Sequence, residues 1–164
     1  MGNIEVHFSS KSNEWGTPPK LFQWLDNKFG FDLDAAATKE NAKCRKFYTI
    51  EDDALKQDWI KGSDYGNVFL NPPYGNDLGK FIKKAYEESQ KDCSVVCLIP
   101  ARTDTKYFHD YCTKGCIYFI KGRLKFINGS CSASAPFPSA IVVFYKKVLG
   151  ISPATGYIEQ LWEK

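Results

Sequence analysis

Residues 69–75, which read FLNPPYG, place an asparagine, two prolines and a tyrosine directly after an apolar run. A proline fixes φ and has no backbone N–H, so Pro72 and Pro73 form a stiff, extended exit from a strand and leave their carbonyl oxygens free as acceptors. The side-chain oxygen of Asn71 is another acceptor, and Tyr74 has a flat aromatic face. These groups can hold a planar ring that carries an amino group: the Asn71 oxygen and the Pro72 carbonyl each accept one N–H, and Tyr74 stacks.

Such a grip orients the lone pair of a weakly nucleophilic amine toward a reactive electrophile. The structural alternative is a proline-rich turn in which the asparagine caps the strand and the tyrosine is buried. The elements on either side bear on this choice, because a strand before Asn71 and a small Gly75 after Tyr74 favour the chemical interpretation.

The spacing of apolar residues predicts an alternation of helices and strands. A helix is expected from Pro18, with Thr17 as N-cap, Pro18 as first helical residue and Gly30 as stop. Residues 38–50 fit no element. The other expected elements are strands at 31–37, 67–70, 94–101, 116–122, 122–127 and 139–147 and helices at 78–91 and 105–115.

This alternation, with strands crowded at the end, favours a three-layer α/β fold whose sheet is mostly parallel and has an antiparallel C-terminal edge. Ligands of such sheets bind beyond the carboxyl ends of the strands. Residues 69–75, the FDLDAAA stretch at 31–37 and the LIPART stretch at 98–103 all lie at such ends.

Composition sets broader limits. The 164 residues favour one domain, expected at 14–150, with a flexible segment at 1–13 and an extension at 151–164. A net charge of +3 is compatible with a polyanionic partner but too small to identify one. The start of the chain lacks an apolar leader, and no apolar run approaches ~18 residues, so we expect a cytoplasmic protein with no membrane partner.

The six cysteines are expected to be free thiols. Cys93 and Cys97 would lie about 13 Å apart along a strand, which is too far for one metal ion. We therefore expect no metal site.

Four stretches in order resemble motifs of S-adenosylmethionine-dependent amino-methyltransferases: WGTPPKLFQWL, FDLDAAA, EDDAL and NPPY. Together with DW, LIPARTDT, GRLKF and PSAIVVF, they make residues 14–146 similar to the small phage-type (Dam-like) DNA N6-adenine methyltransferases. The resemblance implies a Rossmann-like methyltransferase fold, S-adenosylmethionine as cofactor, DNA as partner and a role in restriction avoidance for a mobile element.

The resemblance also implies where the cofactor binds. Asp34 is the expected partner of its positively charged methionine end, while a helix cap is the alternative role; Asp32 ranks lower because it lies deeper in the strand. Asp53, with Asp52 as competitor, is expected to accept a hydrogen bond from the cofactor's adenine. The residues expected to contact the cofactor are Thr17, Pro18, Asp34, Ala35, Ala36, Asp53 and Asn71.

The usual acidic residue for the ribose is not evident, because only about a dozen residues separate FDLDAAA from EDDAL. That distance is too short for a full helix and strand, so the second strand is expected to be short or missing. Glu40 and Asn41 are the remaining candidates for the ribose contact.

Two polar clusters are candidates for DNA phosphate contacts. Arg102 and Thr103 follow a strand end, and Arg123 and Lys125 would lie on one face of a strand. Solvated surface charge is the alternative. Methylation of a base requires that it leave the stack, so the pocket would hold a flipped adenine.

The catalytic residues expected from these arguments are Asn71, Pro72, Pro73 and Tyr74, acting in transfer of a methyl group to N6 of adenine in DNA. The alternatives are methylation of RNA adenine or of protein glutamine, and a catalytically silent DNA-binding module with the same fold. An N4-cytosine enzyme would more often have serine at Asn71. The oligomeric state and the target site do not follow from the sequence.

Overall fold

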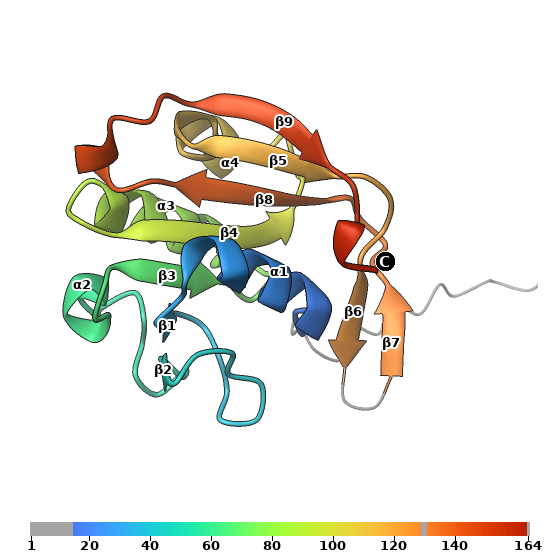
Figure 1. Ribbon diagram of the computed structural model, residues 1–164, viewed down its shortest axis with the longest axis horizontal. Coiled ribbons are helices and arrows are strands. Elements are labelled where there is room, and N and C mark those ends of the chain that lie inside the picture. The colour runs from blue at the N-terminus through green and yellow to red at the C-terminus, as the bar shows by residue number, and fades with distance from the viewer. Residues whose placement is uncertain (1–14, 129–130, 164) are drawn as a thin grey trace, which may run out of the picture.

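A seven-stranded sheet in the order β2-β1-β3-β4-β8-β5-β9 forms the centre of the structure (Figure 1). The computed structural model describes residues 15–128 and 131–163, so the segment expected to be flexible, 1–13, lies outside the described residues. Only β8 runs against its neighbours in this sheet. The strands are β1 Leu33–Asp34, β2 Lys46–Phe47, β3 Asn67–Leu70, β4 Ser94–Pro100, β5 Cys116–Ile120, β8 Ser139–Phe144 and β9 Ala154–Ile158.

The fold is therefore α/β with a mostly parallel sheet, as predicted, and it is consistent with the Rossmann-like fold that the sequence resemblance implies. The antiparallel strand, β8, lies between β4 and β5 rather than at the outer edge. A separate hairpin of β6 Lys125–Asn128 and β7 Cys131–Ser134 extends from one end of the sheet (Figure 1).

Two hydrophobic clusters cover the two faces of the sheet and produce three layers. Alternate residues of a strand point to opposite faces. Val68 and Leu70 of β3 therefore pack with Ile82 of α3, while Phe69 packs with Leu25 of α1. In Figure 1, α1 crosses the near face and α3 and α4 lie behind the sheet. The helices are α1 Pro19–Phe29, α2 Trp59–Gly62, α3 Leu78–Ser89 and α4 Lys106–Asp110.

Helix α1 begins one residue later than the sequence predicts. Pro18 is its N-cap and Pro19 its first residue, and no side chain caps it, so the prediction of Thr17 as the cap and Pro18 as the first residue is wrong. The hydroxyl of Thr17 instead bonds Asn71. The predicted stop is confirmed: Gly30 has φ 62°, a left-handed conformation that glycine adopts readily, and its N–H donates to Asp26 O at 2.7 Å.

The first strands are short, as the spacing of the motifs requires. The strand expected at 31–37 is reduced to Leu33–Asp34, and β2 has two residues. β1 pairs in parallel with both β2 and β3. The expectation of a very short second strand is thus confirmed, because the chain turns back within a dozen residues.

Differences appear toward the C-terminus. The helix expected at 105–115 is α4 followed by a short 3-10 helix, Cys112–Lys114, that ends at Gly115. Residues 154–158, in the expected extension, form β9 and pair in parallel with β5. No helix among residues 15–128 and 131–163 is both long and apolar enough to cross a bilayer.

Candidate active site

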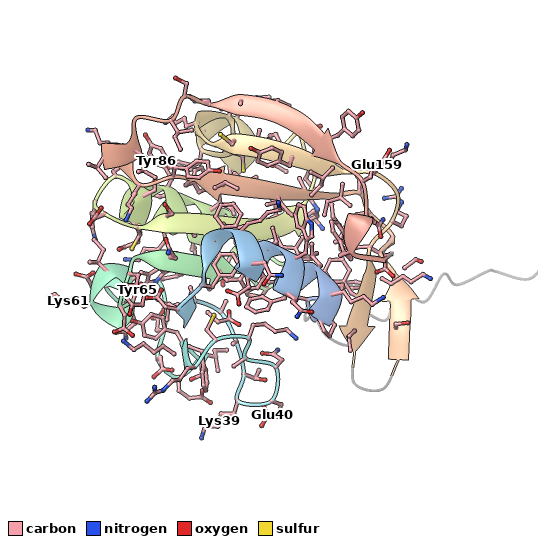
Figure 2. All side chains as sticks on the ribbon, in the orientation of Figure 1. Lys39, Glu40, Lys61, Tyr65, Tyr86 and Glu159 are labelled. Carbon is pink, nitrogen blue, oxygen red and sulfur yellow. The ribbon has the colours of Figure 1, made fainter. Side chains whose placement is uncertain are left out.

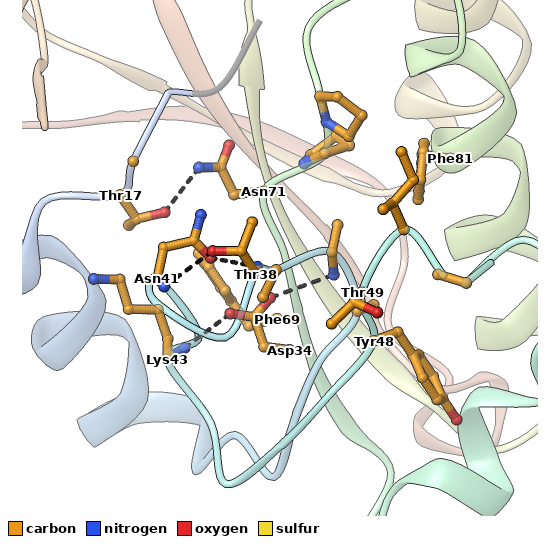
Figure 3. A pocket seen from close by; sticks show the side chains of 18 of the residues that line it. Thr17, Asp34, Thr38, Asn41, Lys43, Tyr48, Thr49, Phe69, Asn71 and Phe81 are labelled. Carbon is orange, nitrogen blue, oxygen red and sulfur yellow. Dashed lines mark hydrogen bonds between the residues drawn. The ribbon is translucent and has the colours of Figure 1, made fainter. Parts of the chain in front are cut away.

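A cavity of about 730 Å³ opens where β1 and β3 end (Figure 3). Its walls come from four stretches of chain: residues 15–17, residues 34–41 with 43 at and after the end of β1, residues 48–51 with 53–55, and residues 69 and 71–73 at the end of β3. Asp77 and Phe81 complete the lining. Parallel strands end at one edge of the sheet, so this is the edge at which α/β proteins bind ligands.

Asn71 stands at the wall of this cavity with its amide held from one side. Its Nδ2 donates to the Trp15 carbonyl oxygen at 2.5 Å and to Thr17 Oγ1 at 2.9 Å (Figure 3). A backbone carbonyl can only accept, so the NH₂ group must face Trp15. The opposite atom, Oδ1, is buried and has no partner among the described residues.

The two prolines give Asn71 this position. β3 pairs with β1 as far as Phe69 and with β4 as far as Leu70, and a proline cannot donate to a ladder beyond that point. Pro72 is buried and Pro73 exposed. The Pro73 carbonyl accepts from Gly75 N at 3.0 Å, which turns the chain toward α3.

Asp34 is a buried carboxylate, 2% exposed, in the same cavity. Its two oxygens accept from Ala36 N at 3.4 Å and Lys43 N at 3.0 Å. Burial raises the pKa of Asp34 from 3.8 to about 6, against the opposing effect of those two N–H groups and the Lys43 charge. A cationic ligand beside Asp34 would reverse that shift, so this site favours an ammonium or another positive group.

Asp32, the lower-ranked candidate for cofactor binding, has a structural role instead. Its carboxylate accepts from Ser63 Oγ at 2.6 Å and from the backbone N–H groups of Asp64 and Tyr65 at 2.5 and 2.6 Å. A fourth bond, at 3.3 Å, comes from Asn67 N. Asp32 therefore ties the loop before β3 to β1 and does not line the cavity.

The acidic loop at 51–53 holds the two candidates for the contact with the cofactor's adenine, and the structure distinguishes them. Asp52 accepts from Thr49 N and Thr49 Oγ1, at 2.7 and 2.8 Å, and stays outside the cavity. Asp53 lines the cavity, and its carboxylate lies 2.7 Å from Lys56 Nζ, which lowers the pKa of Asp53. Its φ of 52° is the only positive value of a non-glycine residue in the described chain. Such strain often marks ligand-binding loops.

Glu40 and Asn41 also line the cavity, at its outer side. Figure 2 shows Lys39 and Glu40 at the far end of the loop after β1. The Asn41 side-chain oxygen accepts from Thr38 N at 2.7 Å and thereby shapes this loop. The sequence also missed Lys43 and Tyr48 as wall residues, because their places depend on how the loop folds back over Asp34.

Tyr74 lies apart from the cavity walls. Its hydroxyl donates to the Leu98 carbonyl at 3.1 Å, and burial holds the pKa of its phenol well above the usual range. The ring makes edge-on contacts with Phe126 and Phe137, at centroid distances of 6.1 and 5.5 Å. Trp15 joins the same two phenylalanines, which forms an aromatic cluster beside Asn71 that no local motif predicts.

The expected DNA contacts lie outside the cavity, all exposed. Arg102 and Thr103 follow the end of β4, and Lys125 begins β6. Arg123 precedes β6, so Arg123 and Lys125 do not occupy one face of a strand as the sequence suggested.

Of the other residues expected to contact the cofactor, Ala35 and Ala36 line the cavity with Asp34. Pro18 does not line the cavity and is the N-cap of α1.

Cys44, Cys93, Cys97, Cys112 and Cys116 are unpaired thiols. Across residues 15–128 and 131–163, no group of three or more histidine, cysteine or acidic side chains is arranged to bind a metal ion.

Known proteins resemble this chain over most of its length. A family model described as DNA N-6-adenine-methyltransferase (Dam) matches residues 7–157. The DNA N-6-adenine-methyltransferase of Haemophilus phage HP1 (strain HP1c1) is 29% identical over 157 residues, which cover 91% of this chain and 88% of that protein. The DNA N-6-adenine-methyltransferase of Escherichia phage T1 is 41% identical over 96 residues, covering 57% of this chain and 38% of that protein.

Proposed function

Because the chain belongs to the Dam family of DNA N-6-adenine-methyltransferases, we propose that it transfers a methyl group from S-adenosylmethionine to N6 of adenine in DNA. One observation carries the proposal beyond the family: Asn71 Oδ1 is a buried acceptor at the wall of the cavity, and no group of residues 15–128 and 131–163 donates a hydrogen bond to it. A buried acceptor without a hydrogen bond costs free energy and calls for a ligand that donates one.

Asn71 and Pro72 act on the target amine. Asn71 Oδ1 accepts one N–H of the adenine amino group, and the Pro72 carbonyl accepts the other. The N6 lone pair is then turned toward the cavity, where it would accept the methyl group of bound S-adenosylmethionine as that group leaves sulfur. The methylated nitrogen would then lose to solvent one of the two protons held by Asn71 and Pro72. Pro73 keeps this segment rigid, so that no reorganisation is needed when the amine reacts.

Tyr74 completes the target site by stacking on the base. Its ring is held by Phe126 and Phe137 and by the bond to Leu98, so the flipped adenine must displace one of these aromatic contacts to reach its face. Flipping takes place against the DNA backbone, which Arg102, Thr103, Arg123 and Lys125 contact.

The charge and the small side chains of the cavity wall suit the cofactor. S-adenosylmethionine supplies, when bound, a methyl group on a positively charged sulfur and an ammonium group. The buried Asp34 carboxylate binds the ammonium, and the small side chains of Ala35 and Ala36 allow close approach. Asp53 accepts from the adenine amino group at the other end, and Thr17 borders the space between them.

The same acceptor pair could hold an adenine of RNA or the amide of a glutamine. The family match and the match to the phage HP1 protein favour DNA. With DNA as the substrate, the reaction takes place in the cytoplasm of a bacterium or a phage-infected cell.

The test is transfer of labelled methyl groups from S-adenosylmethionine to unmethylated DNA, followed by digestion to nucleosides. We expect the label in N6-methyladenine alone. RNA of the same sequence and a glutamine-containing peptide are assayed in parallel. Label in either of these but not in DNA would overturn the substrate assignment. Absence of cofactor binding by calorimetry would overturn the enzymatic function.

A further inference from the structure

We propose that Thr17 is a positioning residue for Asn71, and that the β6–β7 hairpin holds Thr17 in place through Gly16. This inference rests on the proposed function, since it assigns how the catalytic amide is oriented. In this account Thr17 acts by orienting Asn71, and contact with the cofactor is not the main role of its side chain.

The Asn71 amide has two N–H donors, and the chain satisfies both of them. One bonds the Trp15 carbonyl at 2.5 Å and the other Thr17 Oγ1 at 2.9 Å. Turning the amide over would place Oδ1 against the Trp15 carbonyl, and two acceptors repel each other. The two bonds therefore select the one orientation that points Oδ1 away from residues 15–17, to a place where no described residue donates to it.

Among the described residues, the side chain of Thr17 makes one hydrogen bond, which it accepts from Asn71. Thr17 is 3% exposed and does not cap α1. A valine has nearly the same shape but cannot accept a hydrogen bond. The position thus uses the hydroxyl itself, which sequence reasoning assigned to a helix cap.

The neighbouring Gly16 fixes the place of both acceptors. Its N–H donates to Ile127 O and its carbonyl accepts from Ile127 N, each at 3.0 Å, which joins it to β6 as a two-bond bridge. A Cβ on Gly16 would lie 2.5 Å from Ile127 O, too close for any side chain. The segment 15–17 is therefore clamped between the hairpin and Asn71.

The bridge between Gly16 and β6 connects the proposed DNA contacts with the orientation of Asn71. The hairpin strand that bridges Gly16 begins at Lys125, two residues after Arg123, and both of these exposed residues are proposed to contact DNA phosphates. A displacement of β6 by the DNA backbone would move Gly16, and with it the acceptors that orient Asn71.

The first test compares Thr17→Val with Thr17→Ser and, as a matched control, Thr155→Val on the exposed strand β9. We expect Thr17→Val to lower the single-turnover rate of methyl transfer about 10- to 100-fold at saturating cofactor, while the Kd for S-adenosylmethionine changes less than about 3-fold. Thr17→Ser keeps the hydroxyl and should retain most of the rate. A Thr17→Val rate that saturating cofactor restores would overturn the inference in favour of cofactor binding.

The second test replaces Gly16 by alanine and uses Gly156→Ala in β9 as the matched control. An added Cβ at Gly156 meets no atom nearer than 3.7 Å, whereas at Gly16 it meets the Ile127 carbonyl. We expect a slower rate only for Gly16→Ala, with cofactor binding retained. Equal rates for the two alanine variants would contradict the role of the bridge.

A third readout does not depend on methyl transfer. In isotope-labelled protein, the NMR signals of the Asn71 side-chain amide, identified by their loss in Asn71→Ala, should exchange slowly with solvent in the wild type and rapidly in Thr17→Val. Slow exchange in both would overturn the inference whatever the enzyme methylates. Protected signals in a wild type that fails to methylate DNA would instead refute the proposed function alone.

Discussion

The buried carboxyl of Asp34 makes the stability of the free protein depend on pH. Burial raises the pKa of Asp34 from 3.8 to about 6 in the folded state. Between these two values the folded protein keeps a proton that the unfolded chain has released. The free energy of unfolding therefore falls as pH rises through this window. The rise of the pKa from 3.8 to about 6 lowers the free energy of unfolding by about 3 kcal/mol over the whole window, at 1.36 kcal/mol per pKa unit.

Urea unfolding of the wild type and of Asp34→Asn isolates this contribution, because asparagine does not titrate. The wild type should lose about 2 kcal/mol relative to the variant between about pH 4.5 and about pH 7.5. The other carboxyl groups cancel in the difference. Parallel curves, or a wild type that gains stability relative to the variant as pH rises, would refute the assignment of a buried, poorly solvated carboxyl.

The same carboxyl links pH to cofactor affinity. A bound ammonium favours the charged carboxylate and lowers its pKa, so binding below about pH 6 must release a proton. Calorimetry should find that the Kd for S-adenosylmethionine decreases as pH rises through about 6 and then levels. In Asp34→Asn the affinity should be weaker and lack this step.

Three further variants test other parts of the site. Asp53→Gly relieves the positive φ of 52° and removes the carboxylate, so we expect unchanged or higher stability with cofactor affinity reduced about 10-fold, measured by urea unfolding and calorimetry. Tyr74→Phe loses the hydrogen bond to Leu98 but keeps the aromatic face, so the free energy of unfolding should fall by about 1 kcal/mol while the methylation rate is unchanged. Removing Arg123 and Lys125 together should reduce the salt slope of DNA binding by about 1 to 2, as seen in titrations at several ionic strengths.

The sequence predicted those elements whose signals are local. Gly30 ends α1 because a left-handed residue suits glycine, and the prolines after Asn71 end β3 because they lack N–H donors. The parallel order of the sheet followed from the alternation of apolar strands and helices. The sequence also predicted that Asp34, Asp53 and Asn71 would lie near one another at one edge of the sheet, and the three residues line one cavity.

The contacts that the sequence did not predict join distant residues. Thr17 looks like a cap because threonine often begins helices, yet its hydroxyl bonds Asn71, which is 54 residues away. β9 has exposed residues along its length and no strong alternation, so only its pairing with β5 identifies it. Tyr74 is buried against Phe126 of β6 and against Phe137, which are both distant from it along the chain.

The measurement that tests the central claim most directly is single-turnover methyl transfer by Asn71→Ala, with cofactor and DNA at saturation and both Kd values determined separately. The variant removes Oδ1, the acceptor that has no donor within the described part of the chain, and leaves Asp34 and the exposed basic residues in place. We predict that the rate falls at least about 100-fold while both Kd values stay within about 3-fold of the wild type. A variant that methylates adenine at the wild-type rate would contradict the account.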